Sequence, residues 1–304
     1  MAQSIGSRSQ IAYVNEVTPG TTPVTPAMKQ LFGYQSNTLD LTKGVISDTA
    51  IRSNGMKKFS RHGNTAVGGT ITASYAPGTQ DDLLEAALYG GWSTNLLKLG
   101  TTETSMTMEV GYLNTALYRV FTGCHFSGFR LNVPSGNQIV TAEFDVVGMG
   151  GSVSGTALDA SLTAPTLEGT PLVHLDGVFN LGGAPIAYFT GLQLNVANQL
   201  TPNYALGSGT ARSVTKGMTS VTGQITAYYE SNALATSFLS EATTDISFTL
   251  TSDSAEHEYI LPNVKLNGFS APLSGDGPVI ATIIFEALYD DTMTSVMSIG
   301  RTYP

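Results

Sequence analysis

The sequence has little charge, a single cysteine and no long hydrophobic run. Charged residues make up 12% of the 304 residues, whereas hydrophobic residues make up 41% and there are 33 glycines. This composition is typical of β-rich proteins with many turns, and less typical of helical or disordered chains. Cys124, the only cysteine, has no intrachain disulfide partner, which argues against a fold built for an oxidising compartment.

Membrane and export signals are also lacking. No stretch approaches the roughly 18 apolar residues of a membrane span, and the opening MAQSIGSRSQ has no apolar signal core. We therefore expect neither export by a signal peptide nor insertion into a membrane. Assembly in a cytoplasm is the simpler interpretation.

Sequence motifs of enzymes are absent. The chain has no P-loop, no G-x-S-x-G, no H-E-x-x-H, no C-x-x-C and no dinucleotide-binding glycine pattern after a strand. Neighbours on a strand direct their side chains to opposite faces, so Cys124 and His125 would face apart and could not form a catalytic pair. The four histidines lie in different segments without metal-ligand spacing. We expect no catalytic residues, no cofactor and no metal.

The formal net charge is −9, and the imbalance lies in the second half. Residues 1–150 hold 10 basic and 10 acidic groups, whereas residues 151–304 hold 4 and 13. Nucleic-acid affinity depends on Lys and Arg that displace counterions from phosphates. The charge therefore argues against stable DNA binding, although a wall that keeps DNA at a distance remains compatible with it.

The chain repeats itself. Six residues of the first half recur 154 positions later, and further matches flank them in the same order. The first set comprises Val67, Gly69, Ile71, Thr72, Ala73 and Tyr75, which match Val221, Gly223, Ile225, Thr226, Ala227 and Tyr229. The flanking matches are Leu39 and Leu41 with Leu192 and Leu194, Gly128-Phe129 with Gly268-Phe269, and Phe144 with Phe285. A repeat of this size predicts two similar units, which suits a subunit of a symmetric ring.

Each repeat predicts mostly strands and one short helix. Alternation over 67–75 indicates a half-buried strand, and QDDLLEAALY at 80–89 has the acidic start and glycine stop of a helix. The second copy predicts a strand at 221–229 and a helix at 231–242. Further strands are predicted at 38–41, 104–110, 117–122, 126–133 and 138–147, and at 245–251, 257–261, 264–269 and 278–288.

Proline-rich and glycine-rich segments suggest the boundaries of these units. We predict an extended N-terminal arm at 1–34 and a first unit at 35–150. A linker with an entry strand follows at 151–187, and a second unit with a C-terminal arm occupies 188–304. The arm is expected to contact neighbouring subunits instead of packing within its own chain.

Two groups of charged residues are candidates for function. The connection from 45 to 64 has a hairpin turn signal at Asn54-Gly55 and a basic cluster of Arg52, Lys57, Lys58 and Arg61. It is either a solvated surface hairpin or a contact with another subunit.

The second group is acidic. In the strand at 138–147, Ala142, Phe144 and Val146 predict the core face, which leaves Glu143 and Asp145 on the opposite face. The repeat places Glu286 where Asp145 stands. These carboxylates either decorate a polar outer sheet face or line the inner wall of a pore.

Several segments also resemble a known family. NTLDLTKGVISDTAIRSNG, RHGNTAVGGTI, DDLLEAAL and VFTGCHFSGF are similar to the major tail tube proteins of long-tailed bacteriophages. The resemblance covers residues 1–150 directly and the remainder through the repeat. It implies a mainly β fold in which each unit is an orthogonal β-sandwich with one short flanking helix and a long loop.

The resemblance also implies a structural role. Such proteins form six-fold or pseudo-six-fold rings that stack into a tube for double-stranded DNA, with an inner β-barrel completed on oligomerisation. Two units per chain favour a homotrimer over a hexamer. The implied partners are copies of the chain itself, the tail terminator, distal tail proteins and the tape measure protein, in a virion tail assembled in the host cytoplasm.

Two other classes remain open. A β-rich virion or surface adhesin, or a decoration protein, would share the composition, but it would expose a binding patch as a free monomer. A β-rich glycosidase would need two carboxylates about 5 to 10 Å apart across a cleft with aromatic platforms, whereas the only tryptophan, Trp92, follows Gly90-Gly91.

Overall fold

The computed structural model describes residues 3–165, 167, 169–185, 188–230, 232–252, 255–273 and 275–303. The fold is mainly β, with 55% of residues in strands and 6% in helices, which confirms the predicted class. Two helices accompany a large antiparallel sheet, and the single chain does not close a barrel. Neither helix in the described part of the chain is long and apolar enough to cross a membrane.

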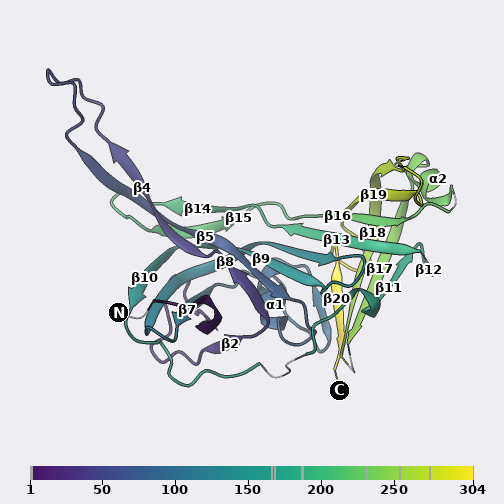
Figure 1. Ribbon diagram of the computed structural model, residues 1–304, viewed down its shortest axis with the longest axis horizontal. Helices are drawn as coiled ribbons and strands as arrows, with labels where there is room; N and C mark the ends of the chain where they lie inside the picture. The colour runs from purple at the N-terminus through teal and green to yellow at the C-terminus, as the bar shows by residue number, and fades with distance from the viewer. Residues whose placement is uncertain are drawn as a thin grey trace.

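The first half contains ten strands, one α-helix and a 3-10 turn (Figure 1). They are η1 (Gly6–Arg8), β1 (Ser9–Asn15), β2 (Lys29–Leu31), β3 (Tyr34–Asn37), β4 (Asp40–Ser47), β5 (Ser60–Ser74), α1 (Asp81–Ala87), β6 (Leu96–Lys98), β7 (Met106–Tyr112), β8 (Leu117–Val133), β9 (Thr141–Gly148) and β10 (Gly150–Ser154). One sheet has the order β2-β1-β7-β8-β10, and the other has the order β4-β5-β9-β8. Strand β8 belongs to both sheets.

The described part of the second half follows with a 3-10 turn, ten strands and one helix. They are η2 (His174–Asp176), β11 (Gly177–Leu181), β12 (Ala184–Pro185), β13 (Phe189–Ala197), β14 (Leu200–Tyr204), β15 (Ala211–Lys216), β16 (Ser220–Tyr228), α2 (Ala233–Leu239), β17 (Thr243–Ser252), β18 (Ala255–Ser270), β19 (Ile280–Ala287) and β20 (Ser298–Thr302). The predicted helix at 231–242 is therefore present, although Ser231 lies outside the described residues.

The two halves have the same strand order. β13-β16-β19-β18 repeats β4-β5-β9-β8, and β12-β11-β17-β18-β20 repeats β2-β1-β7-β8-β10. Helix α1 packs on β8, and α2 packs on β18. Each half is thus a pair of sheets that share one long strand.

Matching irregularities support this correspondence. The β8–β9 ladder has a bulge between Phe126 and Gly128, and the β18–β19 ladder has one between Leu266 and Gly268. The matched glycines Gly69 and Gly223 also share a role, because a Cβ at either would lie within 2.6 Å of neighbouring backbone, at the β3–β4 junction for Gly69 and on β13 for Gly223. Both permit a close backbone approach inside the sheet.

The long shared strand differs from the prediction of two short ones. Strand β8 is continuous from 117 to 133, with a bulge opposite Thr107 where Gly123 has a φ of +63°. A glycine in this left-handed conformation lets a strand bend without ending. The bend carries β8 from one sheet into the other, and the predicted gap at 123–125 is this bulge.

The predicted N-terminal arm and the predicted linker both contain paired strands. Residues 1–34 include β1 and β2, whose Ile11 and Leu31 side chains are buried, so the expectation of an unpacked arm is wrong for these strands. The predicted linker holds β10, which pairs with β8, and β11, which pairs with β17. Residues 166, 168, 186 and 187 of that segment lie outside the described residues. These strands are short, at three to seven residues, so alternation over them gives a weak signal.

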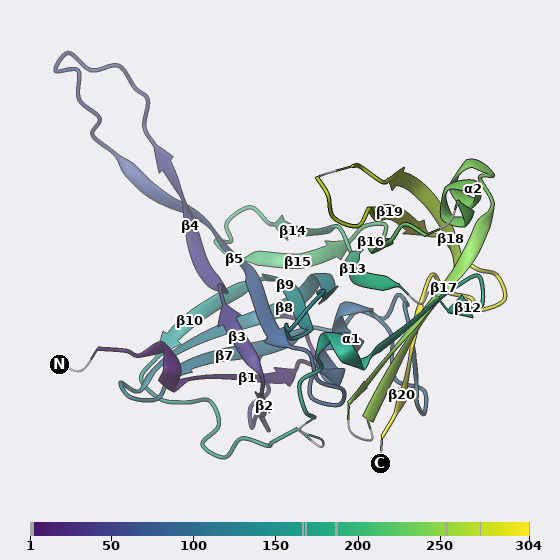
Figure 2. The same ribbon diagram turned by 45° about the vertical axis from the view of Figure 1, so that its right-hand side comes forward.

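The halves are joined into one continuous sheet. Antiparallel pairing of β8 with β13 matches Val133 with Leu192 and Gly128 with Ala197 (Figure 2). We call this pairing the seam. The resulting order β4-β5-β9-β8-β13-β16-β19-β18, which we call the long sheet, has one face on a core cluster that spans both halves.

The C-terminal strand also ties the halves together. In the first turn of α1, the Asp81 carboxylate accepts from Arg301 Nη1 at 2.7 Å and from the Tyr303 hydroxyl at 2.6 Å, and His257 Nε2 lies 3.4 Å away. Burial alone would raise the pKa of Asp81, but the hydrogen bonds from His257, Tyr303 and Arg301 outweigh it and lower that pKa.

Candidate functional site

The second face of the long sheet is mostly polar, although Ile284 is 50% exposed on it. Along β9, Ala142, Phe144 and Val146 are buried in the core, and Glu143 and Asp145 alternate with them on the opposite face, as predicted. The other strands follow the same alternation. The polar face includes Thr70 and Thr72, Arg130 and Asn132, Gln193 and Asn195, Thr222 and Gln224, and Glu286.

Glu143 and Asp145 are paired with a cation that the sequence analysis missed. Arg130 on β8 lies 3.0 Å from Glu143 through Nε and 2.9 Å from Asp145 through Nη2. Thr70 Oγ1 also donates to Asp145 at 2.6 Å. These side chains are 31–44% exposed, so the ion pairs face solvent and partly neutralise this patch. The signal that could have revealed Arg130 is its place beside Glu143 in the β8–β9 ladder, which depends on the bulge at 127.

Glu286 lies on the polar face, but it is not the counterpart of Asp145. Asp145 pairs with Gly128, and the matching glycine Gly268 pairs with Ile284. The counterpart of Asp145 is therefore Ile284, and Glu286 corresponds to Val147. The sequence match of Phe144 with Phe285 shifted the alignment of β9 with β19 by two residues. Glu286 still lies on the polar face, because strand side chains alternate with a period of two. Asn267 Nδ2 donates to Glu286 at 3.1 Å.

The basic cluster lies on a long hairpin that projects from the fold (Figure 1). Its arms are β4 and β5, and its tip has a turn in which Gly55 N donates to Arg52 O at 3.0 Å, with Gly55 at a φ of +68°. The predicted turn at Asn54-Gly55 is therefore present. We call residues 45–62 the projecting hairpin.

Only part of the basic cluster is paired within the projecting hairpin. Arg52 forms an ion pair with Asp48 at 3.2 Å and lies over the Phe59 ring. Lys57, Lys58 and Arg61 are exposed, and Lys58 also lies over Phe59. The structure brings Arg52, Lys58 and Phe59 together, whereas no residue in the described chain forms an ion pair with Lys57, Lys58 or Arg61.

Exposed hydrophobic side chains accompany the charges and were also missed. The Val45, Ile46, Ile51, Met56 and Phe59 side chains are all more than half exposed, and Ile51 is fully exposed. So many exposed apolar groups on one projecting element mark an interaction surface more than a solvated loop. The sequence signal was available in the hydrophobic residues scattered between the lysines and arginines.

A second, shorter hairpin supports the base of the first. Strands β14 and β15 occupy the β13–β16 connection, which corresponds to the β4–β5 connection of the first half. Tyr204 donates to Thr65 O at 3.0 Å, and Met149, Ala211 and Val214 form a small core cluster beneath. Its tip exposes Leu206 fully. The two hairpins meet at the base of the projecting hairpin, which then extends away from the fold while β14 and β15 stay along it (Figures 1 and 2).

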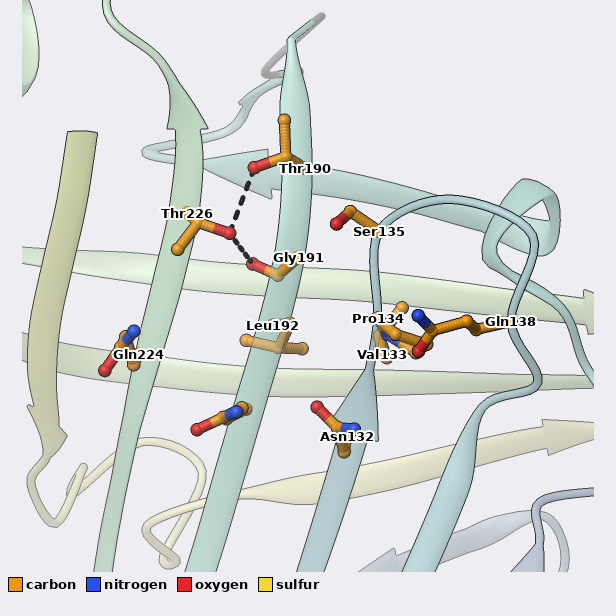
Figure 3. Close-up of a pocket in the computed structure, with 11 residues that line it drawn as sticks. Asn132, Val133, Pro134, Ser135, Gln138, Thr190, Gly191, Leu192, Gln224 and Thr226 are labelled. Atoms are coloured by element: carbon orange, nitrogen blue, oxygen red, sulfur yellow. Dashed lines mark hydrogen bonds between the residues drawn. The ribbon is translucent and has the colours of Figure 1, made fainter. Parts of the chain in front are cut away.

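The seam carries a shallow cavity without charged residues. A space of about 250 Å³ is lined by residues of β8, β13 and β16, among them Asn132, Gln193 and Gln224 (Figure 3). Thr190 donates to Thr226 at 3.0 Å, and Thr226 donates to Gly191 O at 3.3 Å. The described residues include no group of three or more His, Cys, Asp or Glu side chains placed to hold a metal. Cys124 is fully buried, which raises the pKa of its thiol.

The architecture is thus a polar sheet face, two projecting hairpins and free sheet edges, which suits self-assembly. The sequence model of a family described as phage tail tube protein matches residues 6–287. The chain belongs to the phage tail tube protein family. Tail tube proteins of this family are structural components of the phage tail. No curated protein matches this tail tube chain significantly.

Proposed function

We propose that three copies of this tail tube protein form a ring of pseudo-six-fold symmetry, and that stacked rings form the tube through which double-stranded DNA leaves the virion. The observation that carries the proposal is the long sheet, which spans both halves, has one polar face and ends in strands free to pair. Edge strands of this kind favour pairing with another chain, and closure into a barrel removes them. Two matching halves in each of three chains supply six similar units.

The polar face of the long sheet is proposed as the lumen wall. Glu143, Asp145 and Glu286 would present carboxylates to the channel, partly balanced by Arg130. A wall without excess cations gives DNA phosphates few groups to displace their counterions. Lys265 pairs with Glu286 in the β18–β19 ladder and lies on the same face, where Glu241 partly balances it. Most of the other polar groups are threonines and amides, so the wall would be wettable without an excess of cations.

The projecting hairpin is proposed to join successive rings. Arg52, Lys57, Lys58 and Arg61 would contact acidic groups of the next ring, while Ile51, Met56 and Phe59 would be buried there. Stacked rings use a head-to-tail contact that does not close, and such contacts generate a filament. Each exposed ion pair contributes at most about 1 kcal/mol, so the contact depends on repetition around the ring and on apolar burial.

The proposal includes the partners of the complete tail. The tube would end on the tail terminator at one side and on distal tail proteins at the other, and it would assemble around the tape measure protein in the host cytoplasm. We expect no catalytic activity and no cofactor requirement. The DNA contact would be transient and independent of sequence.

Electron microscopy of the purified protein tests this function. Negative stain should show rings or tubes with a central channel, and averages of rings should show three-fold symmetry with six similar lobes. Sedimentation should give a mass that is a multiple of three chains. A stable monomer under all conditions would overturn the proposal and would favour the alternative, an adhesin or decoration protein attached to the virion surface.

A further inference from the structure

We propose that the seam between chains reproduces the seam inside the chain, so that residues 268–273 of one copy pair antiparallel with residues 37–42 of the next, with Phe269 opposite Leu41. This inference rests on the proposed ring and names its partner, a second copy of the same chain. It specifies which strands meet and in which register.

The register follows from the correspondence between halves. The bulges place Gly268 at the position of Gly128, a difference of 140 residues. Val67 pairs with Leu41 and Val221 pairs with Val196, so Leu41 corresponds to Val196, a difference of 155. The sequence match of Leu39 and Leu41 with Leu192 and Leu194 was therefore wrong by two residues. Within the chain, Val196 pairs with Phe129. Transferring that pair gives Leu41 opposite Phe269.

Both strands have an edge available for this pairing. The first half's β8 has β9 on one side of residues 128–133 and β13 on the other. On β18, residues 264–270 pair with β19, and no other strand of the described chain pairs with residues 266–270. Likewise β13 lies between β16 and β8, whereas β4 pairs only with β5 among the described strands.

Burial differs between the two halves as this proposal requires. At the seam, Phe129 is 0% and Val133 is 4% exposed. Their counterparts are Phe269, which is half-buried, and Leu273, which is 85% exposed. Pairing with the neighbour's β4 would cover both side chains in the way that β13 covers Phe129 and Val133. The exposed apolar groups therefore lie where the proposed seam places them.

Backbone hydrogen-bond directions also agree. Asn198 N donates to Ser127 O across the seam at 2.8 Å, and alternation then directs the N–H groups of Val196 and Leu194 toward β8 as well. Their counterparts, Leu41 and Leu39, should direct N–H groups toward the free edge.

In the single chain these two N–H groups bond only to nearby side chains. Leu39 N donates to Asn37 Oδ1 at 2.9 Å, and Leu41 N donates to Asp40 Oδ1 at 2.6 Å. Such local bonds satisfy an exposed edge until a strand replaces them.

A proline in the segment is compatible with the pairing. Pro272 has no N–H, and it corresponds to Asn132, which lies between the seam-facing residues 131 and 133. By alternation, the backbone groups of Asn132 face β9 and not β13. Pro272 therefore shortens the β18–β19 ladder without removing a donor from the proposed edge.

Disulfide trapping tests the register. Asp40 and Ser270 correspond to the Asn195–Arg130 pair, a non-hydrogen-bonded pair whose Cα atoms should lie about 4.5 Å apart, within disulfide range. The variant Asp40→Cys/Ser270→Cys should give interchain disulfides in assembled tubes, with covalent products of up to three chains. The displaced control, Asp40→Cys/Gly268→Cys, should react about tenfold less because diagonal neighbours are 7–8 Å apart. Cys124 is fully buried and should not compete.

The possible results distinguish failure of the proposed strand register from failure of the proposed ring. The proposed register between chains would be wrong if the displaced pair formed disulfides as readily as the matched pair, or if neither pair formed them. The proposed tube function would remain in either case. Failure of the unmodified protein to form rings would overturn both. If Asp40→Cys prevents assembly by removing the Asp40–Arg119 ion pair, Thr42→Cys/Gly268→Cys is a second matched pair. A reconstruction of unmodified tubes must also show Phe269 opposite Leu41.

Discussion

At the residue scale, Asp81 is a buried carboxylate that holds the C-terminal strand against helix α1. Replacing Asp81 with Ala would leave Arg301 and Tyr303 without their acceptor in a site where the carboxylate is 11% exposed. We expect a loss of about 3 kcal/mol in the free energy of unfolding, measured by urea denaturation, because breaking a buried pair leaves an uncompensated charge.

Asp82→Ala is the matched control. Asp82 is one residue further along the same helix, and its ion pair with Lys29 is 31–49% exposed, although it also accepts from the Tyr13 hydroxyl at 3.1 Å. Its loss should therefore cost about 1 to 2 kcal/mol, less than the loss of Asp81. Equal effects of the two substitutions would contradict the special role of Asp81.

The same residue predicts a pH dependence. The pKa of Asp81 is lowered in the folded protein from its ordinary value of 3.8. A carboxyl with a depressed folded pKa stabilises the fold above its unfolded pKa, and that stability is lost as the pH falls through the folded pKa. Asp81→Asn should therefore flatten the decrease in stability below about pH 4. Denaturation curves for both proteins between pH 7 and pH 2, taken at one ionic strength, would reveal an unchanged decrease if the prediction is wrong.

Gly69 offers a second residue-scale prediction. A Cβ at this position would lie 2.5 Å from the Leu39 Cα and N atoms, so Gly69→Ala must push β5 away from the β3–β4 segment. The cost should be about 2 kcal/mol by the usual penalty of overpacking, measured by thermal or urea unfolding.

Gly68→Ala provides the comparison for Gly69. Its added Cβ would meet only Val146 O, at 3.5 Å, which is an ordinary contact. It should change stability little, and a large effect there would show that strand propensity and not backbone approach decides the result.

The sequence predicted which face of a strand a side chain lies on better than it predicted which residues of other strands that side chain contacts. Strict alternation on β9 was sufficient to place Phe144 in the core and Asp145 outside. Alternation was not sufficient to place Arg130 beside Asp145 or to match Glu286 with its counterpart Val147. Bulges shift the pairing register between strands, and they leave no distinct signal in one sequence.

At the element scale, the projecting hairpin should control ring stacking. Replacing Arg52, Lys57, Lys58 and Arg61 by Ser should leave soluble rings that stack poorly, because the cations are proposed to contact the next ring. Tube length by electron microscopy at low and high salt measures this effect. Lys265→Ser removes a 44% exposed cation on β18, away from the hairpin, and should leave tube length normal. Normal tubes from the fourfold variant would exclude this contact.

Element boundaries were predictable where composition and alternation agreed. Helix α1 and strands β9, β16 and β19 were predicted within three residues at each end, because each has buried residues at a clear period. Strand β5 begins at Ser60, seven residues before its predicted start. Strands β1 and β10 were missed as packed elements, and β11 lies in the segment where an entry strand was predicted without bounds. Their pairing with β7, β8 and β17 is a long-range property that the local residues do not specify.

At the scale of the whole molecule, the polar face predicts how assembled tubes treat DNA. Unmodified tubes should not retain DNA at physiological salt, because their proposed wall has no excess of cations. The variant Glu143→Lys/Asp145→Lys/Glu286→Lys should retain DNA in a salt-sensitive manner and slow genome ejection, since lysines displace phosphate counterions. Filter binding of tubes with labelled duplex measures the retention.

Arg130→Gln is the control for the lysine variant, because it makes the proposed lumen wall more negative. It removes the cation beside Glu143 and Asp145 and should retain no more DNA than the unmodified tube. Equal retention by the threefold lysine variant and the unmodified tube would contradict the lumen assignment, as would a tube structure with these side chains outside.

The seam between β8 and β13 also reduces the number of separate chains that must associate to form a ring. A ring of six separate units would require six bodies to meet, and each contact would weaken on dilution. Here three of the six seams of the proposed ring would lie within a chain, where the effective concentration of one half for the other is on the order of millimolar or higher. Ring closure would then depend on the third power of chain concentration instead of the sixth, so rings could form while the protein is still scarce.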